Sequence, residues 1–464
     1  MPQKMLMGFN TRNISTSYRT NTAVTIGSLK GSGLGSTTRM YKWCHQHSDN
    51  PISCVFQQQK ISQNDILSWL NISDLLPSNL GNIIGNIGLN GQIIIGGGNG
   101  GQLQFSSNLG KTWSPYPNSP NLPDINTQPL NVIPWSSVVM SDNTQYVIGV
   151  PYVTTDYNFS QFTNYNGIYY TKDSGLTWTL QQSCPIYGGG LLNFNDSNTK
   201  ANSLLFIDAG ISQDGQYMAV LTTPRQSSQL NIYLIISNNY GTTWTAYSID
   251  PYTSPYNVTT FASSISIANT SSLINDYLMI TSKLVRNPTT SLYENGTCCI
   301  STDGGNNFSV PTDISGNDFI YSSLSDDGKN QVCVSSPNTN VNNGEIPIRG
   351  RLYLSRNYGT NFNQIIELPY IDIDNYQGFG GVSMSADGKY ITASVLDQDG
   401  ILQFIYISND NGNTWKQIKN DSNGTSFIYS SQLKNLGFLN TNYSGQYQMI
   451  TGLNSIYINN NYGN

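Results

Sequence analysis

One short turn motif occurs seven times in this chain, and its last copy ends at the final residue. Each copy begins with Ser, Thr or Asn, has Asn or Asp at the second residue after it, and has Gly at the fourth residue after it. In the first six copies, Trp or Phe follows three residues after the Gly. The glycines are separated by 65, 66, 64, 54, 53 and 51 residues. Internal repeats at such spacing are typical of repeat arrays and propellers. The central residues are Asn108, Asp173, Asn239, Asp303, Asn357, Asp410 and Asn461.

The chemistry of this turn predicts a structural role. An Asn or Asp side chain can bond to backbone two residues on, and Gly supplies the positive φ of a tight hairpin. Four copies carry Asn and three carry Asp, so the hydrogen bond matters and the charge does not. The aromatic residue is expected to return into the sheet packing. This pattern argues against a metal-binding loop, and we predict neither a metal nor a cofactor.

The motif resembles the Asp-box, or BNR, repeat of sialidases and related propellers, whose general form is Ser-x-Asp-x-Gly-x-Thr-Trp. The resemblance covers residues from about 66 to 464. It implies an all-β, seven-bladed β-propeller in which each box is the turn between the third and fourth strands of a blade. Because the box is structural, it says little about chemistry.

A second repeat alternates with the first. Its turn residues precede β-rich runs, which is the pattern of a strand-turn-strand hairpin. We assign it to the turn between the first and second strands, so each blade is predicted to be a four-stranded antiparallel meander. The copies span 141–146, 212–217, 325–330, 385–390 and 442–447, with looser forms at 89–92 and 275–277.

The last blade lacks a fourth strand, because no run of residues follows Gly463. An unpaired sheet edge would be exposed there. The segment Leu67–Ile72, which contains Trp69, matches the Trp-bearing fourth strands of other blades and is predicted to complete the last one. The alternative is a short helix over 62–76.

Residues 1–60 differ in kind from the propeller, predicted to span 61–464. They hold seven basic residues and one acidic residue, while the whole chain has a net charge of −6. The stretch Thr25–Thr38 is typical of extended or flexible chain. We interpret residues 1–60 as an anchoring arm that docks on an assembly partner or on the propeller itself; nucleic acid or an anionic surface is the alternative.

Both histidines of the chain, His45 and His47, lie in the arm between Cys44 and Cys54. These four residues could ligate zinc, the two cysteines could form a disulfide, or the thiols could be free. The other four cysteines are expected to be buried single thiols in the propeller. They are Cys184, Cys298, Cys299 and Cys333.

Targeting signals are not apparent: Met5–Phe9 is too short for a signal peptide, and no run is long enough to span a membrane. The Asn-rich composition and the arm are weakly similar to surface proteins of large DNA viruses, notably over residues 36–54. This resemblance implies a structural protein at the virion surface that serves host attachment. The Asn-x-Ser/Thr sequons would be glycan sites only in a secreted protein.

Enzymatic activity is the second hypothesis, and no residue is assigned as catalytic. The sialidase resemblance implies three arginines, a Tyr nucleophile with its Glu, an Asp acid and an Arg-Ile-Pro motif, but Arg-Ile-Pro is absent. Arg225, Arg286 and Arg349 lie in comparable connections and could cluster. A two-carboxylate glycosidase would instead use acids such as Asp208, Asp372 or Asp374.

Insertions provide the clearer functional signal. Blades of the first half carry extra residues after their fourth strands and between their second and third strands. Both kinds of connection are expected on the face of the propeller opposite the boxes. The inserted segments are rich in Tyr, Asn, Ser and Gly, the composition of adaptable binding surfaces. The acidic propeller argues against nucleic acid. We therefore favour a non-catalytic, carbohydrate- or protein-binding propeller over a glycoside hydrolase, and leave homo-oligomerisation open. The candidate contact residues are Tyr152, Tyr157, Tyr165, Tyr187, Tyr252, Tyr256, Arg225 and Arg286.

Overall fold

A computed structural model divides the chain into two compact units, Trp69–Gly463 and the remainder, Met1–Ser68 with Asn464. The structure describes residues 3–7, 14–18, 38–47, 50–60 and 69–463. The last range is interrupted at 78–79, 125–131, 154–164, 195–203, 225–231, 250–260, 269–276, 284, 287–292, 295, 297, 315–317, 337–349, 369–376, 398–399 and 420–438.

The N-terminal unit contains two antiparallel hairpins where the sequence predicted only an extended arm. Strand β1 (Gln3–Met7) pairs with β2 (Ile14–Tyr18), and β3 (Thr38–His47) pairs with β4 (Asn50–Lys60). Residues 25–37 of the Gly/Ser/Thr stretch lie outside the described residues. The β3–β4 register places Cys44 directly opposite Cys54. A disulfide, a zinc site and free thiols stay alternatives for this pair.

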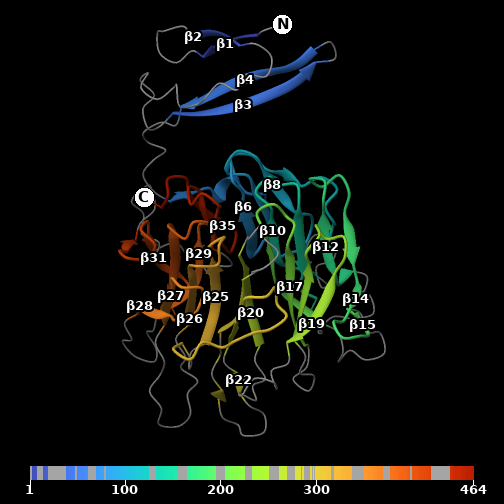
Figure 1. Ribbon diagram of the computed structural model, residues 1–464, viewed down its shortest axis with the longest axis vertical. Coiled ribbons are helices and arrows are strands. Elements are labelled where there is room, and N and C mark those ends of the chain that lie inside the picture. Colours follow the sequence, from blue (N-terminus) through green and yellow to red (C-terminus); the bar gives the residue numbers. More distant parts are fainter. Residues whose placement is uncertain are drawn as a thin grey trace. The chain divides into compact units, whose positions relative to one another are not determined.

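The second unit is the predicted seven-bladed all-β propeller, whose strands run around a common axis (Figure 1). Blades one to three are β6 (Ile83–Ile87), β7 (Ile93–Gly97), β8 (Gln104–Ser106), β9 (Ser114–Pro115); β10 (Trp135–Met140), β11 (Val147–Pro151), β12 (Ile168–Thr171), β13 (Thr179–Gln181); and β16 (Leu204–Ile211), β17 (Met218–Pro224), β18 (Ile232–Ser237), β19 (Thr245–Ile249). Blades four and five are β20 (Phe261–Ile267), β21 (Leu278–Lys283), β24 (Cys298–Ser301); and β25 (Asp318–Leu324), β26 (Gln331–Ser336), β27 (Arg351–Ser355), β28 (Asn363–Glu367). Blades six and seven are β29 (Gln377–Met384), β30 (Ile391–Asp397), β31 (Leu402–Ser408), β32 (Lys416–Ile418); and β33 (Leu439–Thr441), β34 (Gln448–Gly452), β35 (Ser455–Asn459), β5 (Leu70–Asn71).

The fourth blade departs from the predicted four-stranded form. It has three strands, and a single bridge between Ile300 and Ser309 stands in place of the fourth. Pro311 follows two residues later and has no backbone N–H to donate, so the ladder cannot extend there. Two short ribbons stand outside the blades: β14 (Ser183–Pro185) with β15 (Leu191–Asn193), and β22 (Val285–Arg286) with β23 (Tyr293–Glu294).

The boxes form the turns between third and fourth strands, as predicted, but their hydrogen bonds differ from the expected pattern. In the sixth blade the Asp410 carboxylate accepts a bond from the amide of Thr414, four residues on, at 2.9 Å. The amide of Gly412 donates to Ser408 Oγ at 2.8 Å. Two successive residues, Asn411 (φ 61°) and Gly412 (φ 75°), are left-handed and curl the chain back, which brings the fourth residue and not the second to the carboxylate.

Where it is described, the second repeat forms the turn between first and second strands, as predicted; in the looser copy at 275–277, residues 275–276 lie outside the described residues. In the third blade, Ser212 Oγ accepts a bond from the amide of Tyr217 at 2.9 Å, and its own hydroxyl donates to Asp214 at 2.7 Å. These turns also link neighbouring blades. The amide of Asp142 donates to the carbonyl of Gln213 at 3.0 Å.

The ring closes as predicted. Strand β5 pairs with β35, with Leu70 opposite Ile458, and completes the seventh blade. The Trp69 side chain is fully buried between the sixth and seventh blades, among residues that include Leu402 and Tyr457. The alternative helix over 62–76 is wrong at these positions: the helical turn is a 3-10 helix confined to Ser73–Leu75.

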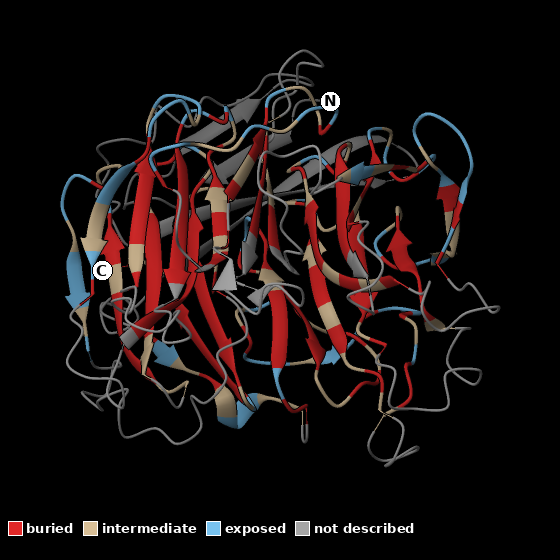
Figure 2. Ribbon diagram, turned by 90° about the horizontal axis from the view of Figure 1, so that it is seen from below, coloured by how far each residue is buried: buried red, intermediate tan, exposed pale blue. Residues whose placement is uncertain are grey.

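Hydrophobic clusters between adjacent blades form the core. The strands are buried along most of their length, whereas the connecting turns are exposed (Figure 2). The first strands of blades two to six each carry a β-bulge at an equivalent position, as between Phe206 and Asp208 in β16. A bulge bends its strand and redirects the side chains beside it. Among the described residues, no helix is long and apolar enough to cross a membrane.

Candidate functional site

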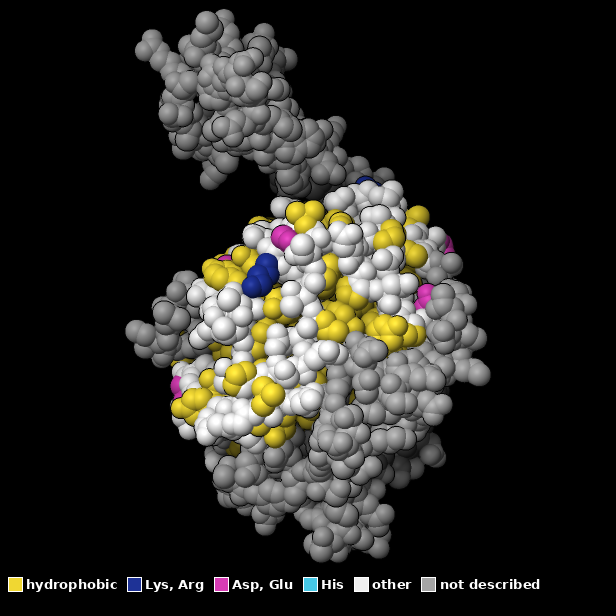
Figure 3. Space-filling view, turned by 90° about the vertical axis from the view of Figure 1, so that its right-hand side faces the viewer, with side chains coloured by type: hydrophobic (Ala, Val, Ile, Leu, Met, Phe, Trp, Pro, Cys, Tyr) yellow, Lys and Arg dark blue, Asp and Glu magenta, His cyan; other side chains and the backbone are white. Residues whose placement is uncertain are grey.

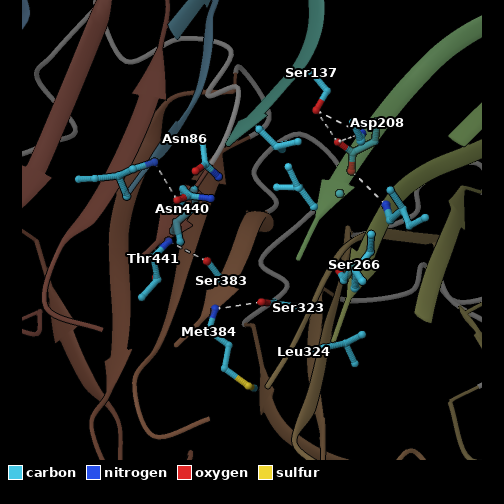
Figure 4. Close-up of a pocket in the computed structure, with 18 of the residues that line it drawn as sticks. Asn86, Ser137, Asp208, Ser266, Ser323, Leu324, Ser383, Met384, Asn440 and Thr441 are labelled. Carbon is cyan, nitrogen blue, oxygen red and sulfur yellow. Dashed lines mark hydrogen bonds between the residues drawn. The ribbon is translucent and has the colours of Figure 1, made fainter. Parts of the chain in front are cut away.

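The first strands of all seven blades surround a cavity of about 240 Å³ on the propeller axis (Figure 4). The polar residues in its wall are mostly short Ser, Thr and Asn side chains. Among the described residues of the wall, the three charged ones are all acidic, and none is Lys, Arg or His. These acids are Asp142, Asp208 and Asp326.

A belt of polar side chains in or beside the wall of this cavity connects most neighbouring blades. Ser383 Oγ accepts a bond from the amide of Thr441 at 2.8 Å, joining blades six and seven (Figure 4). Asn440 Oδ1 accepts from the amide of Ile87 at 3.2 Å and joins the seventh blade to the first. Further bonds join blades two and three, four and five, and five and six. The polar wall of the cavity therefore holds the ring together.

Asp208, a candidate glycosidase acid, is the most heavily bonded member of this belt. It follows the bulge in β16 and is buried. Its Oδ1 accepts bonds from Ser137 Oγ and from its neighbouring amide at Ala209, each at 2.9 Å, and Oδ2 accepts from the amide of Ile265 at 3.0 Å. Asp208 therefore links blades two, three and four. Burial raises the pKa of its carboxyl to about 6, and the donated bonds limit the rise.

Two further acids belong to turns at one end of the cavity. Burial raises the pKa of Asp142 to about 6. Burial also raises the pKa of Asp326 to about 7; a hydrogen bond from the Tyr443 hydroxyl opposes that rise, and the negative charge of Asp142 adds to it. A side-chain hydrogen bond from Gln213 opposes the rise in pKa at Asp142, whose buried Oδ2 accepts no bond from the described residues.

This geometry favours a structural role for the axial cavity. A general acid must give its proton to substrate, but both Asp208 oxygens accept bonds from groups that hold three blades together. The other acids named as candidates, Asp372 and Asp374, lie outside the described residues. Within the described part of the chain, no group of three or more His, Cys, Asp or Glu residues could hold a metal.

The candidate contact residues fall into four groups, three of which lie in the described part of the chain. Tyr152 and Tyr165 are half-buried, and Tyr165 packs against the core cluster between the first two blades. Arg286 lies in β22, opposite Tyr293 in the register. The remaining candidate, Tyr187, is exposed. Several residues lie outside the described part of the chain: Tyr157, Tyr252, Tyr256, Arg225 and Arg349.

Tyr187 lies in the β14–β15 hairpin, which follows the last strand of the second blade and packs on the outer strand of the third (Figure 1). Cys184 and Leu192 of this hairpin are buried in the core cluster that also contains Trp244. A parallel bridge joins Ile186 to Ala246 of β19, and the amide of Tyr187 donates to the Ala246 carbonyl at 2.8 Å. The hairpin is therefore fixed to the third blade.

The Tyr187 ring stacks on Tyr247, with centroids 5.1 Å apart and planes 24° from parallel. Its side chain is nevertheless 69% exposed, because Tyr247 covers one face only. Leu191, across the hairpin tip, is 67% exposed. Three glycines with positive φ, at 188 to 190, form the tip between them. The sequence did not lead us to predict Tyr247 or Leu191 as contact residues. Tyr247 follows Ala246 in a predicted fourth strand, and the alternation of such a strand indicates that the two side chains lie on opposite faces.

These features define a seven-bladed β-propeller with Asp-box turns, and no protein-family model matches the chain. It is similar to a sialidase of Paraclostridium sordellii, 28% identical over 152 residues, which are 32% of each chain. It is similarly 28% identical over 152 residues to a sialidase of Clostridium perfringens, covering 32% of this chain and 34% of that one. The chain thus matches about a third of the length of these curated relatives.

Solved propellers of different kinds share the fold. The GH74 xyloglucanase of Xanthomonas campestris matches 85% of this chain with 53% of its own, at 11% identity and a TM-score of 0.51. YCF48 of Cyanidioschyzon merolae matches 85% of this chain with 99% of its own, at 13% identity and a TM-score of 0.49. At 11% identity, the likeness to the xyloglucanase shows the fold alone.

Proposed function

We propose that this protein is a non-catalytic interaction propeller that binds a glycan or protein ligand through its inserted segments. The observation that carries this proposal is the exposed Tyr187, held on the third blade by backbone bonds and stacked on Tyr247. An aromatic ring held rigidly in solvent offers contact area at little cost in conformational entropy. The structural bonding of Asp208 supports binding over hydrolysis.

The proposal includes an anchoring role for residues 1–60, whose basic charge suits an acidic partner, and a location at a virion or cell surface. This location is argued from the arm and from composition alone. Labelling of the protein in intact particles and cells tests it. A purely intracellular, unassembled pool would contradict it.

The alternative function is a glycoside hydrolase, favoured by the 28% identity to sialidases over a third of the chain. The two functions separate in one experiment: incubation with a chromogenic sialoside and a polysaccharide panel, with binding and product release both measured. We expect binding without turnover. Turnover abolished by Asp208→Asn, with the variant still folded, would establish the hydrolase instead.

A further inference from the structure

The outer rim of the second and third blades exposes aromatic and aliphatic side chains, and the described elements that carry them contain no charged residue. The segment 183–193, which comprises β14, its tip and β15, contains no charged residue, and neither does β19. Seen from this side, the propeller presents hydrophobic side chains among uncharged polar ones, and charged groups are sparse (Figure 3). A ligand at this place meets neither a cation nor an anion from these elements.

We infer that the platform formed by Tyr187 and Tyr247 binds a neutral pyranose of a polysaccharide chain. One face of the Tyr187 ring lies on Tyr247, and the rest of this 69% exposed side chain faces solvent. An aromatic face carries negative partial charge, which suits the electropositive C–H groups on one side of a pyranose. The hydroxyl of Thr245, on the same face of β19 as Tyr247, can bond to sugar hydroxyls.

Charge and size select this ligand over two others. A sialic acid carries a carboxylate, and its recognition needs a cation that the hairpin and β19 lack. A protein interface of ordinary stability covers about 800 Å² on each partner, whereas the exposed large hydrophobic side chains of the hairpin are Tyr187 and Leu191. A sugar ring matches this small platform. The inference rests on the proposed binding function and adds the class of ligand.

The backbone at the tip is suited to contact with an extended ligand. A Cβ atom added at Gly188 or at Gly189 would meet nothing within 4 Å, so the tip stands clear of the propeller. Its positive φ angles, 90° and 122°, suit Gly. A polysaccharide can therefore pass over the tip and lie along the Tyr187 ring without meeting a side chain there.

The test measures binding of cellohexaose, xylohexaose and mannohexaose, with 3′-sialyllactose as the anionic probe, by isothermal titration calorimetry on the full chain. We expect at least one neutral probe to bind, and Tyr187→Ala to weaken it about tenfold. Tyr187→Phe keeps the ring and should stay within about twofold. The matched control is Tyr358→Asn, which removes another exposed tyrosine stacked on a neighbouring ring.

The outcomes separate this inference from the proposed function. If a neutral probe binds the wild type and Tyr187→Ala equally, the platform is wrong while glycan binding stands. Binding of 3′-sialyllactose alone overturns the neutral ligand. If no probe of either kind binds, both the platform and the glycan-binding function fall. Because Tyr187 is exposed, its truncation opens no core cavity, and thermal unfolding of each variant checks the fold.

Discussion

The backbone amide of Ile72 donates a hydrogen bond to the carbonyl of Ile456 at 3.0 Å, and so joins the two ends of the propeller. With the pairing of β5 and β35, it covers the edge of β35 in the seventh blade. Removal of residues 1–60 should leave this bond, and the unfolding transition, unchanged. Removal of residues 1–72 should expose the edge of β35 and cause aggregation. Light scattering and circular dichroism distinguish the two truncations.

Trp69 provides a point variant of the same prediction. Its side chain is fully buried between the sixth and seventh blades. Trp69→Ala should lower the free energy of unfolding by about 3–5 kcal/mol. Leu70→Ala changes the next residue, which is 50% exposed; it is the control and should change the free energy of unfolding little. Equal effects of the two substitutions in chemical denaturation would contradict the assigned closure.

Much of this fold was predictable from the sequence, because its signals are local. The box glycines fixed the number of blades, and the missing strand after Gly463 pointed to Trp69. The role of Asp208 was not predictable, since its partners Ser137 and Ile265 are 71 and 57 residues away on other blades. Tyr187 was recognised as exposed and aromatic, but its stacking on Tyr247 depends on the docking of a hairpin on the next blade.

A tyrosine pair links the fourth and fifth blades. Tyr358 has a φ of 61°, a left-handed conformation that is costly for a bulky residue, and its ring stacks on Tyr277 with centroids 5.4 Å apart. We expect Tyr277→Ala to destabilise by about 1 kcal/mol, because it removes the stack and leaves the strain. Tyr358→Asn removes both and should be near neutral. A double-mutant cycle by denaturant unfolding should show the two to be non-additive.

The acids of the axial cavity predict how stability depends on pH. Burial raises the pKa of Asp326 to about 7, and that of Asp142 and of Asp208 to about 6. In unfolded chain the value is about 3.9, so the folded protein binds these protons more tightly. Their contribution to stability is full below about pH 4 and is lost as the pH rises through 6 to 7. The midpoint temperature of thermal unfolding should therefore decrease as the pH is raised from 5 to 8.

Asp326→Asn tests this dependence, since Asn keeps an oxygen that can accept from the Tyr443 hydroxyl but carries no charge. We expect the variant to unfold about 1–3 °C higher than wild type at pH 8 and to depend less on pH. The control is Asp214→Asn, an exposed acid in an equivalent turn, which should leave the slope unchanged. The prediction is contradicted if the unfolding temperature of the wild type increases from pH 5 to pH 8 and Asp326→Asn shows the same dependence on pH. In that case these acids do not determine the pH dependence of stability.

For the Asp boxes we expect the opposite dependence of stability on pH, in strong acid. Bonds from the hydroxyl and amide of Thr414 lower the pKa of Asp410 to about 2. Its contribution is therefore present above about pH 4 and is lost as the pH falls toward 2. Asp410→Asn keeps an oxygen for the Thr414 amide, as Asn357 does for Asn361 in the fifth blade at 3.1 Å. It should be near neutral at pH 7 and should unfold with less dependence on pH below 4.

Asp410→Ala separates the hydrogen bonds of this box from its charge. The substitution leaves the amide of Thr414 and the hydroxyl of Ser408 without their acceptor, and should cost about 1 kcal/mol at pH 7. Denaturant unfolding at pH 7 compares the two variants directly. Equal losses of unfolding free energy from Asp410→Asn and Asp410→Ala would mean that the charge, and not the hydrogen bonds, stabilises the box. That result would contradict our explanation of why the boxes use Asn and Asp interchangeably.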